Sequence, residues 1–111
     1  MLPLYVTSGE PAGIGPDICL SLAARIDERP IVVLGDMNLL RTRAACLGLD
    51  IELIEYSGQE ASSTQGQLYV EHVPLSEAVV MGELNPENAP YVLEQLRRSA
   101  DYAMSGKSVG V

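Results

Sequence analysis

The sequence predicts an α/β fold built on a largely parallel sheet, and two observations carry this prediction. Short apolar runs alternate with segments of helical periodicity along the chain, a pattern typical of βαβ units. One of these runs, PIVVLGD at 30–36, is apolar almost without interruption, as in a parallel strand that is buried on both faces. Turns at the carboxyl ends of such strands are the usual places for binding ligands.

The first strand and the first helix are joined by a turn rich in glycine. A short run of strand formers, LYVTS, leads into TSGEPAGIGPDI at 7–18, which has three glycines and two prolines. Helical periodicity begins at Pro16, a residue that suits the first position of a helix. From there Ile18, Leu22 and Ile26 fall on one predicted stripe.

The middle of the chain continues the alternation. After the run at 30–36, Asp36 or Asn38 can cap a helix through NLLRTRAACLG, and Gly48 is its expected end. Residues 50–56 (DIELIEY) are the next predicted strand. A polar loop, SGQEASSTQG, separates them from a further predicted strand, QLYVEHV.

The strongest helical pattern lies at 85–106 (NPENAPYVLEQLRRSADYAMSG). Two pairs of opposite charge stand four residues apart along it, Glu94 with Arg98 and Arg97 with Asp101. The sequence SVGV, which follows this helix, has the composition of another strand. Apolar residues occupy one face of the predicted helix: Val92, Leu96, Ala100, Ala103 and Met104.

Composition and charge narrow the class of protein. The chain has 111 residues, one domain's worth, and 47% of them are hydrophobic. A net charge of −8 argues against nucleic acid or an anionic membrane as a partner. No apolar run is long enough to span a bilayer and no secretory signal is evident, so we expect a cytoplasmic protein. Cys19 and Cys46 lack metal-ligand spacing and are expected to be reduced and packed.

The glycine turn does not match a phosphate-binding motif. A P-loop needs a lysine, and the chain has none before Lys107. A dinucleotide fingerprint needs a third glycine where Ile18 stands. Pro16 removes one N–H from the start of the helix, and Asp17 places negative charge where a phosphate would bind.

Two interpretations of the turn stay open from chemistry alone. It can be a tight strand-to-helix connection that needs a positive φ at Gly13 or Gly15. It can also be a loop whose small residues let a ligand approach the backbone, with Glu10 presented at the tip.

Two blocks of the sequence resemble one enzyme family. SGEPAGIGPDI is similar to the opening signature of the 4-hydroxythreonine-4-phosphate dehydrogenases, and GELNPENAPYVLEQLRRSAD at 82–101 resembles that family's next block. The resemblance implies the N-terminal part of an isocitrate/isopropylmalate-dehydrogenase-like three-layer αβα fold. On this basis residues 1–111 are expected to be a single α/β segment, the N-terminal fragment of a longer two-domain enzyme.

The resemblance also implies a reaction and its cofactors. Family members use NAD or NADP to oxidise 4-phosphohydroxy-L-threonine, and decarboxylation then gives 3-amino-2-oxopropyl phosphate in pyridoxine 5′-phosphate biosynthesis. They are homodimers whose histidines hold a divalent metal ion (Zn, Mg or Co). The only histidine here, His72, stands outside both blocks, and we assign it no metal or catalytic role. The catalytic residues and metal ligands are therefore expected outside this chain, which alone would be inactive.

The family's fold suggests where a cofactor lies. In related decarboxylating dehydrogenases the first loop borders the nucleotide, which makes Gly9, Glu10 and Gly13 the candidate cofactor-binding residues. Asp36 is more simply explained as a helix cap than as a ribose ligand. Three alternatives remain: a dehydrogenase of a phosphorylated four-carbon sugar acid, a phosphate acyltransferase, and a non-catalytic α/β binding module.

Overall fold

A parallel sheet forms the middle layer of the structure, a computed structural model that describes residues 3–24, 29–59, 65–75, 83 and 85–107. Within these residues the strands lie in the order β1-β2-β4-β3 and all neighbours are parallel. Their bounds are Leu4–Thr7 (β1), Ile31–Gly35 (β2), Glu52–Glu55 (β3) and Gln67–His72 (β4). The predicted parallel sheet is confirmed.

Strand β2 lies inside the sheet, as its uninterrupted apolar sequence predicts. Val33 is paired with Val6 of β1 on one side and with Val70 of β4 on the other. Val32, Val33 and Leu34 have no exposed surface. Because successive side chains of a strand point to opposite faces, β2 needs apolar residues at every position.

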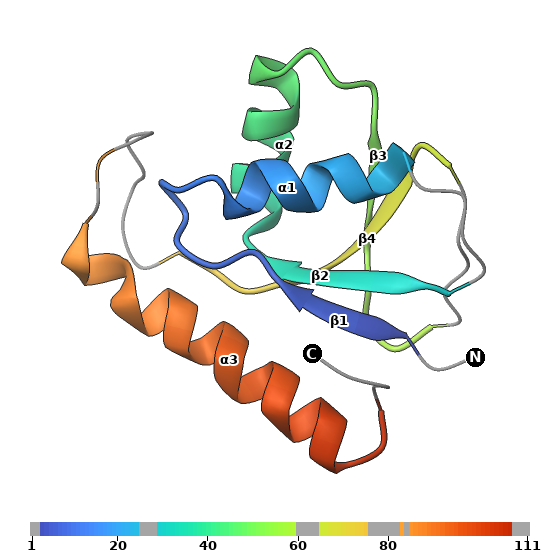
Figure 1. Cartoon of the computed structure of the whole chain (residues 1–111), viewed down its shortest axis with the longest axis vertical. Helices are drawn as coiled ribbons and strands as arrows, with labels where there is room; N and C mark the ends of the chain where they lie inside the picture. The colour runs from blue at the N-terminus through green and yellow to red at the C-terminus, as the bar shows by residue number, and fades with distance from the viewer. Residues whose placement is uncertain (1–2, 25–28, 60–64, 76–82, 84, 108–111) are drawn as a thin grey trace.

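Helices cover both faces of the sheet, which gives the three layers (Figure 1). Helices α1 (Gly15–Ser21) and α2 (Met37–Cys46) pack with Val33 and Val70 on one face. Helix α3 (Ala89–Met104) covers the other face, where Tyr91 packs with Val32 and Leu34. The expected αβα layering is therefore present. No helix in the described part of the chain is long and apolar enough to cross a membrane.

The ends of α2 agree with the sequence prediction. The Asp36 carboxylate accepts a hydrogen bond from the backbone N–H of Leu39 at 2.9 Å, so Asp36 is the N-cap. Its second oxygen accepts from the N–H of Leu75 at 3.0 Å. Gly48 follows the helix with a φ of +68°, the left-handed conformation that glycine adopts at helix ends.

Helix α1 differs from the predicted stripe. Its α-helical turns end at Ser21, and a 3₁₀ turn continues to Ala24. Cys19, Leu20 and Ala23 face the core, whereas Ile18 is 56% exposed. The predicted Ile26 and the short SVGV strand lie outside the described residues.

Helix α3 carries the clearest correction. The buried side chains of α3 are Tyr91, Gln95 and Ser99, two of them polar, while Val92 of the predicted face is half-buried and packs against the core. Leu96, on the predicted apolar face, is 50% exposed and Met104 is 88% exposed. Periodicity located the helix correctly but not the face that is buried, because polar side chains of α3 bond to the end of β1, as described below.

Candidate functional site

The glycine turn forms a loop at the carboxyl end of β1. This signature loop, residues 8–14, leaves the sheet after Thr7, and α1 begins directly after it at Gly15. The loop thus lies at the edge of the parallel sheet where open α/β folds bind ligands. The three candidate residues Gly9, Glu10 and Gly13 are all within it.

Two glycines are required by the course of the backbone. A Cβ on Gly15 would stand 2.0 Å from the carbonyl oxygen of Ser8, so only glycine lets α1 begin this close to β1. Gly9 has a φ of +74°. The expectation of a positive φ at Gly13 or Gly15 was wrong: the left-handed residue is Gly9, where the chain leaves the strand.

Helix α3 holds the start of the loop through Gln95. Its side-chain oxygen accepts a hydrogen bond from the Gly9 N–H at 2.9 Å, and its amide nitrogen donates to the Gly9 carbonyl at 3.4 Å. The same oxygen lies 3.3 Å from the Ser8 hydroxyl. Gln95 has no exposed surface, so these contacts replace the water that its amide loses.

The Ser8 hydroxyl extends this network into the sheet. It donates to the carbonyl of Leu34 at 3.0 Å and lies 3.3 Å from the hydroxyl of Tyr91. The Tyr91 oxygen also accepts the backbone N–H of Asp36 at 2.9 Å. Burial raises the pKa of the Tyr91 phenol, which therefore stays protonated. A Cβ on Gly35 would come within 2.7 Å of the Ser8 hydroxyl oxygen, so glycine makes room for the network.

Helix α2 holds the other half of the loop through Arg43. The guanidinium donates to the carbonyls of Pro11 at 2.7 Å and Gly13 at 3.1 Å, and to the Asp17 carboxylate at 2.9 Å. Only 3% of the Arg43 side chain is exposed. The loop is thus bonded to a helix on each face of the sheet. Sequence reasoning missed Arg43, Gln95, Ser8 and Tyr91, because no local pattern marks bonds between distant segments.

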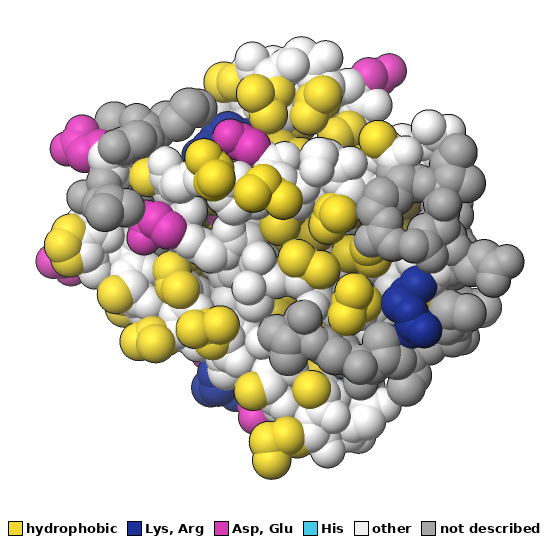
Figure 2. All heavy atoms as spheres, viewed as in Figure 1, with side chains coloured by type: hydrophobic (Ala, Val, Ile, Leu, Met, Phe, Trp, Pro, Cys, Tyr) yellow, Lys and Arg dark blue, Asp and Glu magenta, His cyan; other side chains and the backbone are white. Residues whose placement is uncertain are grey.

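Part of the loop remains open to solvent. The Glu10 side chain is half-buried, and one of its carboxylate oxygens accepts a hydrogen bond from the backbone N–H of Ala12 at 3.4 Å. A Cβ built on Gly9 would meet no atom within 4 Å. Ile14, the last residue of the loop, is 73% exposed, and hydrophobic side chains also reach the surface over α1 and along α3 (Figure 2). A ligand could therefore reach Gly9 and Glu10.

His72 lies in a different place. At the end of β4 its Nδ1 accepts the backbone N–H of Met37 at 3.0 Å. Among the described residues, no group of three or more His, Cys, Asp or Glu side chains could hold a metal ion.

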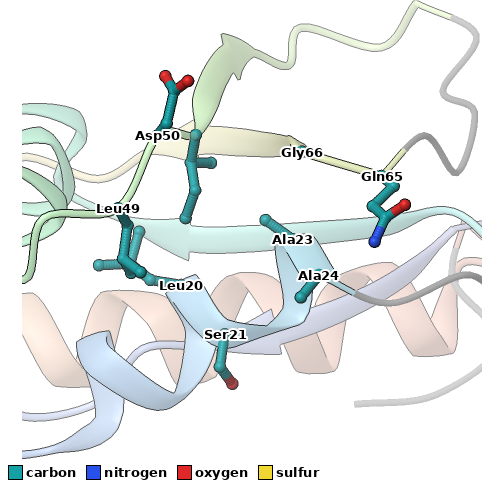
Figure 3. Close-up of a pocket in the computed structure, with 9 residues that line it drawn as sticks. Leu20, Ser21, Ala23, Ala24, Leu49, Asp50, Gln65 and Gly66 are labelled. Carbon is teal, nitrogen blue, oxygen red and sulfur yellow. The ribbon is translucent and has the colours of Figure 1, made fainter.

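An apolar pocket lies far from the signature loop. It has a volume of about 430 Å³ and lies beside the C-terminal end of α1 and the starts of β3 and β4 (Figure 3). Leu20, Ala23, Leu49 and Ile51 line it. Since all strands run in one direction, this is the amino-terminal edge of the sheet, opposite the signature loop.

Curated proteins that are similar to this chain share one name. The 4-hydroxythreonine-4-phosphate dehydrogenase of Neisseria meningitidis serogroup B is 52% identical over 107 residues, which cover 96% of this chain and 31% of that protein. The enzyme of the same name from Vibrio cholerae is 46% identical over 94% of the chain and 32% of its own length. This chain resembles the N-terminal part of 4-hydroxythreonine-4-phosphate dehydrogenases. It spans about a third of the length of these relatives. No protein-family model matches it.

Solved structures agree with this match. The 4-hydroxythreonine-4-phosphate dehydrogenase of Klebsiella pneumoniae superposes with a TM-score of 0.83 at 31% identity, over 97% of this chain and 35% of that one. The Burkholderia phymatum enzyme of the same name gives a TM-score of 0.84 at 22% identity and supports the fold alone.

Proposed function

We propose that this chain is the N-terminal part of an enzyme that oxidises 4-phosphohydroxy-L-threonine with NAD or NADP. The β-keto acid product then loses carbon dioxide to give 3-amino-2-oxopropyl phosphate, a step of pyridoxine 5′-phosphate biosynthesis. The observation that carries this proposal is the match of nearly the whole chain, signature loop included, to enzymes named for this dehydrogenase activity. We also propose that the longer protein is a cytoplasmic homodimer, because the sequence resembles the 4-hydroxythreonine-4-phosphate dehydrogenases.

The role that we propose for the signature loop is to border the nicotinamide cofactor. The carbonyls of Pro11 and Gly13 are bonded to Arg43, and both polar atoms of the Gly9 backbone are bonded to Gln95. Most of the polar backbone groups of the loop therefore already have hydrogen-bond partners within the protein. What remains for a ligand is the open surface of Gly9 and the carboxylate of Glu10, which can accept hydrogen bonds from ribose hydroxyls.

The cofactors supply chemistry that this chain's residues do not. A bound nicotinamide would accept the hydride from the substrate alcohol. The divalent metal proposed for the longer protein needs ligands beyond the described residues, which contain no fitting cluster. The part that we propose for this chain is to bind and orient the cofactor with Gly9 and Glu10; Gly13 would only line the cleft, because its N–H and carbonyl are bonded to Glu10 and Arg43.

The test is a dehydrogenase assay on the protein encoded by the complete gene. We expect reduction of NAD or NADP with 4-phosphohydroxy-L-threonine, loss of activity with a chelator, and recovery when divalent metal is restored. A phosphorylated four-carbon sugar acid serves as the competing substrate. Faster turnover of the sugar acid would replace the proposed substrate, and absence of nucleotide reduction with either compound would refute a dehydrogenase.

A further inference from the structure

The side chain of Gln95 is an unusual choice for its position. It lies in the middle of α3, points to the sheet, and has no exposed surface. An apolar residue would ordinarily fill such a site, because burying an amide costs free energy unless each polar atom finds a partner. Here both polar atoms of the amide find their partners at Ser8 and Gly9.

The contact with Gly9 is two-sided. The Gln95 oxygen accepts the Gly9 N–H at 2.9 Å, and its nitrogen donates to the Gly9 carbonyl at 3.4 Å. The N–H and the C=O of Gly9 belong to the two peptide groups on either side of its Cα, so the side chain of Gln95 holds both groups and limits rotation about φ and ψ of Gly9. Glu10 follows directly in the chain, so the orientation of its backbone depends on how Gly9 is held.

We propose that Gln95 is a positioning residue for the cofactor site: it fixes Gly9 and Glu10 in the conformation that receives the nucleotide and does not itself touch the ligand. This inference rests on the proposed function, since it assigns the loop to a nicotinamide cofactor. A loop that is already ordered loses less conformational entropy when the ligand binds. Without the amide of Gln95, the cofactor would have to order the loop itself.

The variant Gln95→Met tests this in the protein encoded by the complete gene. Methionine has a similar length and fits a buried helical position, but it offers no partner to Gly9. We expect the KM for NAD or NADP to rise about tenfold, in line with the loss of one or two hydrogen bonds, while kcat changes less than about twofold. Hydrogen exchange of the Gly9 amide should also become about tenfold faster.

Two further variants separate positioning from general stability. Ser99→Ala removes another buried polar group from the same face of α3, but its hydroxyl bonds to Leu96 of its own helix and not to the loop. It should leave the KM and the Gly9 exchange rate unchanged. Gln95→Glu keeps an oxygen for the Gly9 N–H; burial favours the protonated carboxyl, whose O–H can donate to the Gly9 carbonyl, so this variant should restore much of the slow exchange. If Gln95→Met does not fold, the KM and the Gly9 exchange rate of Gln95→Glu still test the proposal.

The outcomes separate the two proposals. A wild-type protein that neither binds nor reduces a nicotinamide cofactor overturns the proposed function, and the inference about Gln95 as a cofactor-positioning residue falls with it. An active wild type in which Gln95→Met leaves the KM unchanged overturns the inference alone. Faster exchange at Gly9 with an unchanged KM does the same, because Gln95 would then order a loop that the cofactor does not use.

Discussion

The amide of Gln95 and the backbone of Gly9 are 86 positions apart in the sequence, and the Gly9 N–H donates to the Gln95 side chain at 2.9 Å. This bond links the end of the first strand to the middle of the last described helix. On the opposite face of the sheet, Arg43 bonds to Pro11 and Gly13, further along the same loop. The conformation of the loop therefore depends on contacts with both α2 and α3.

Replacing Gly15 should disrupt the start of α1. In Gly15→Ala the new methyl group would stand 2.0 Å from the Ser8 carbonyl oxygen, a backbone atom held between β1 and the loop. We expect the free energy of unfolding to fall by about 3 kcal/mol or more, since the backbone must shift to accept the methyl group. Chemical denaturation followed by circular dichroism measures this change.

Gly13→Ala is the matched control in the same loop. Its Cβ would meet the Glu10 carbonyl at 3.4 Å, and its φ is not positive. The free energy of unfolding should change by no more than about 1 kcal/mol. Equal losses in the two variants would contradict the close approach of α1 to Ser8.

Replacing Arg43 should destabilise the loop and α1 together. Arg43→Met keeps the apolar stem but removes the guanidinium from the carbonyls of Pro11 and Gly13 and from Asp17. We expect a loss of about 2–4 kcal/mol in the free energy of unfolding, because the carbonyls of Pro11 and Gly13 lose the buried guanidinium that donates to them. Arg41→Met, on the exposed side of the same helix, should cost less than about 0.5 kcal/mol. Urea titrations of both variants measure these losses. Similar unfolding midpoints for the two variants would contradict a stabilising role of the bonds from Arg43 to the loop.

Local patterns in the sequence were sufficient to predict the buried strand β2 and both ends of α2. The apolar run at 30–36 predicted the buried strand β2, and Asp36 and Gly48 predicted the ends of α2. The pairs of Arg97 with Asp101 and of Arg98 with Glu94 also follow from spacing. Each of these features depends on residues within a few positions of one another.

Features that depend on distant partners were not predictable in this way. The buried face of α3 is polar because Tyr91 and Gln95 bond to Ser8 and Gly9, and no helical periodicity contains that information. Hydrophobicity pointed to Leu96, which is half-exposed. The sequence likewise suggests a positive φ at Gly13 or Gly15 and not at Gly9, whose backbone is held by the distant Gln95 of α3.

The two cysteines should differ sharply in reactivity. Both thiols are free; Cys46 is exposed, contrary to the expectation that it is packed, and Cys19 is 3% exposed. Burial raises the pKa of the Cys19 thiol from 9.0 to about 11, so very little of the reactive thiolate exists at pH 8. Mass spectrometry after brief alkylation of the native chain should show one adduct, at Cys46, and two after denaturation. Rapid double labelling of the native chain would contradict the burial of Cys19.

The same pKa predicts weaker stability in alkali. The folded chain keeps the Cys19 proton in a pH range where the unfolded chain has lost it, so the unfolded state binds fewer protons there. The contribution to stability is complete below about pH 9 and falls as the pH rises toward about 11. Cys19→Ala should show a smaller loss of stability over this range, measured by thermal unfolding at a series of pH values. Parallel curves for the two proteins would assign the alkaline loss to other groups.

Removing one oxygen from Tyr91 should expose the dependence of the loop on α3. Tyr91→Phe keeps the ring in the core but leaves the buried N–H of Asp36 without the acceptor it has at 2.9 Å, and takes a neighbour from the Ser8 hydroxyl. An unsatisfied buried donor costs about 1–3 kcal/mol, and we expect the free energy of unfolding to fall by that amount. Tyr69→Phe, whose half-buried ring packs on Tyr56 away from the loop, is the control and should cost less than about 1 kcal/mol. Hydrogen exchange at Asp36 gives the site-specific reading: it should accelerate in Tyr91→Phe alone, and equal rates in both variants would mean that the phenol does not hold this N–H.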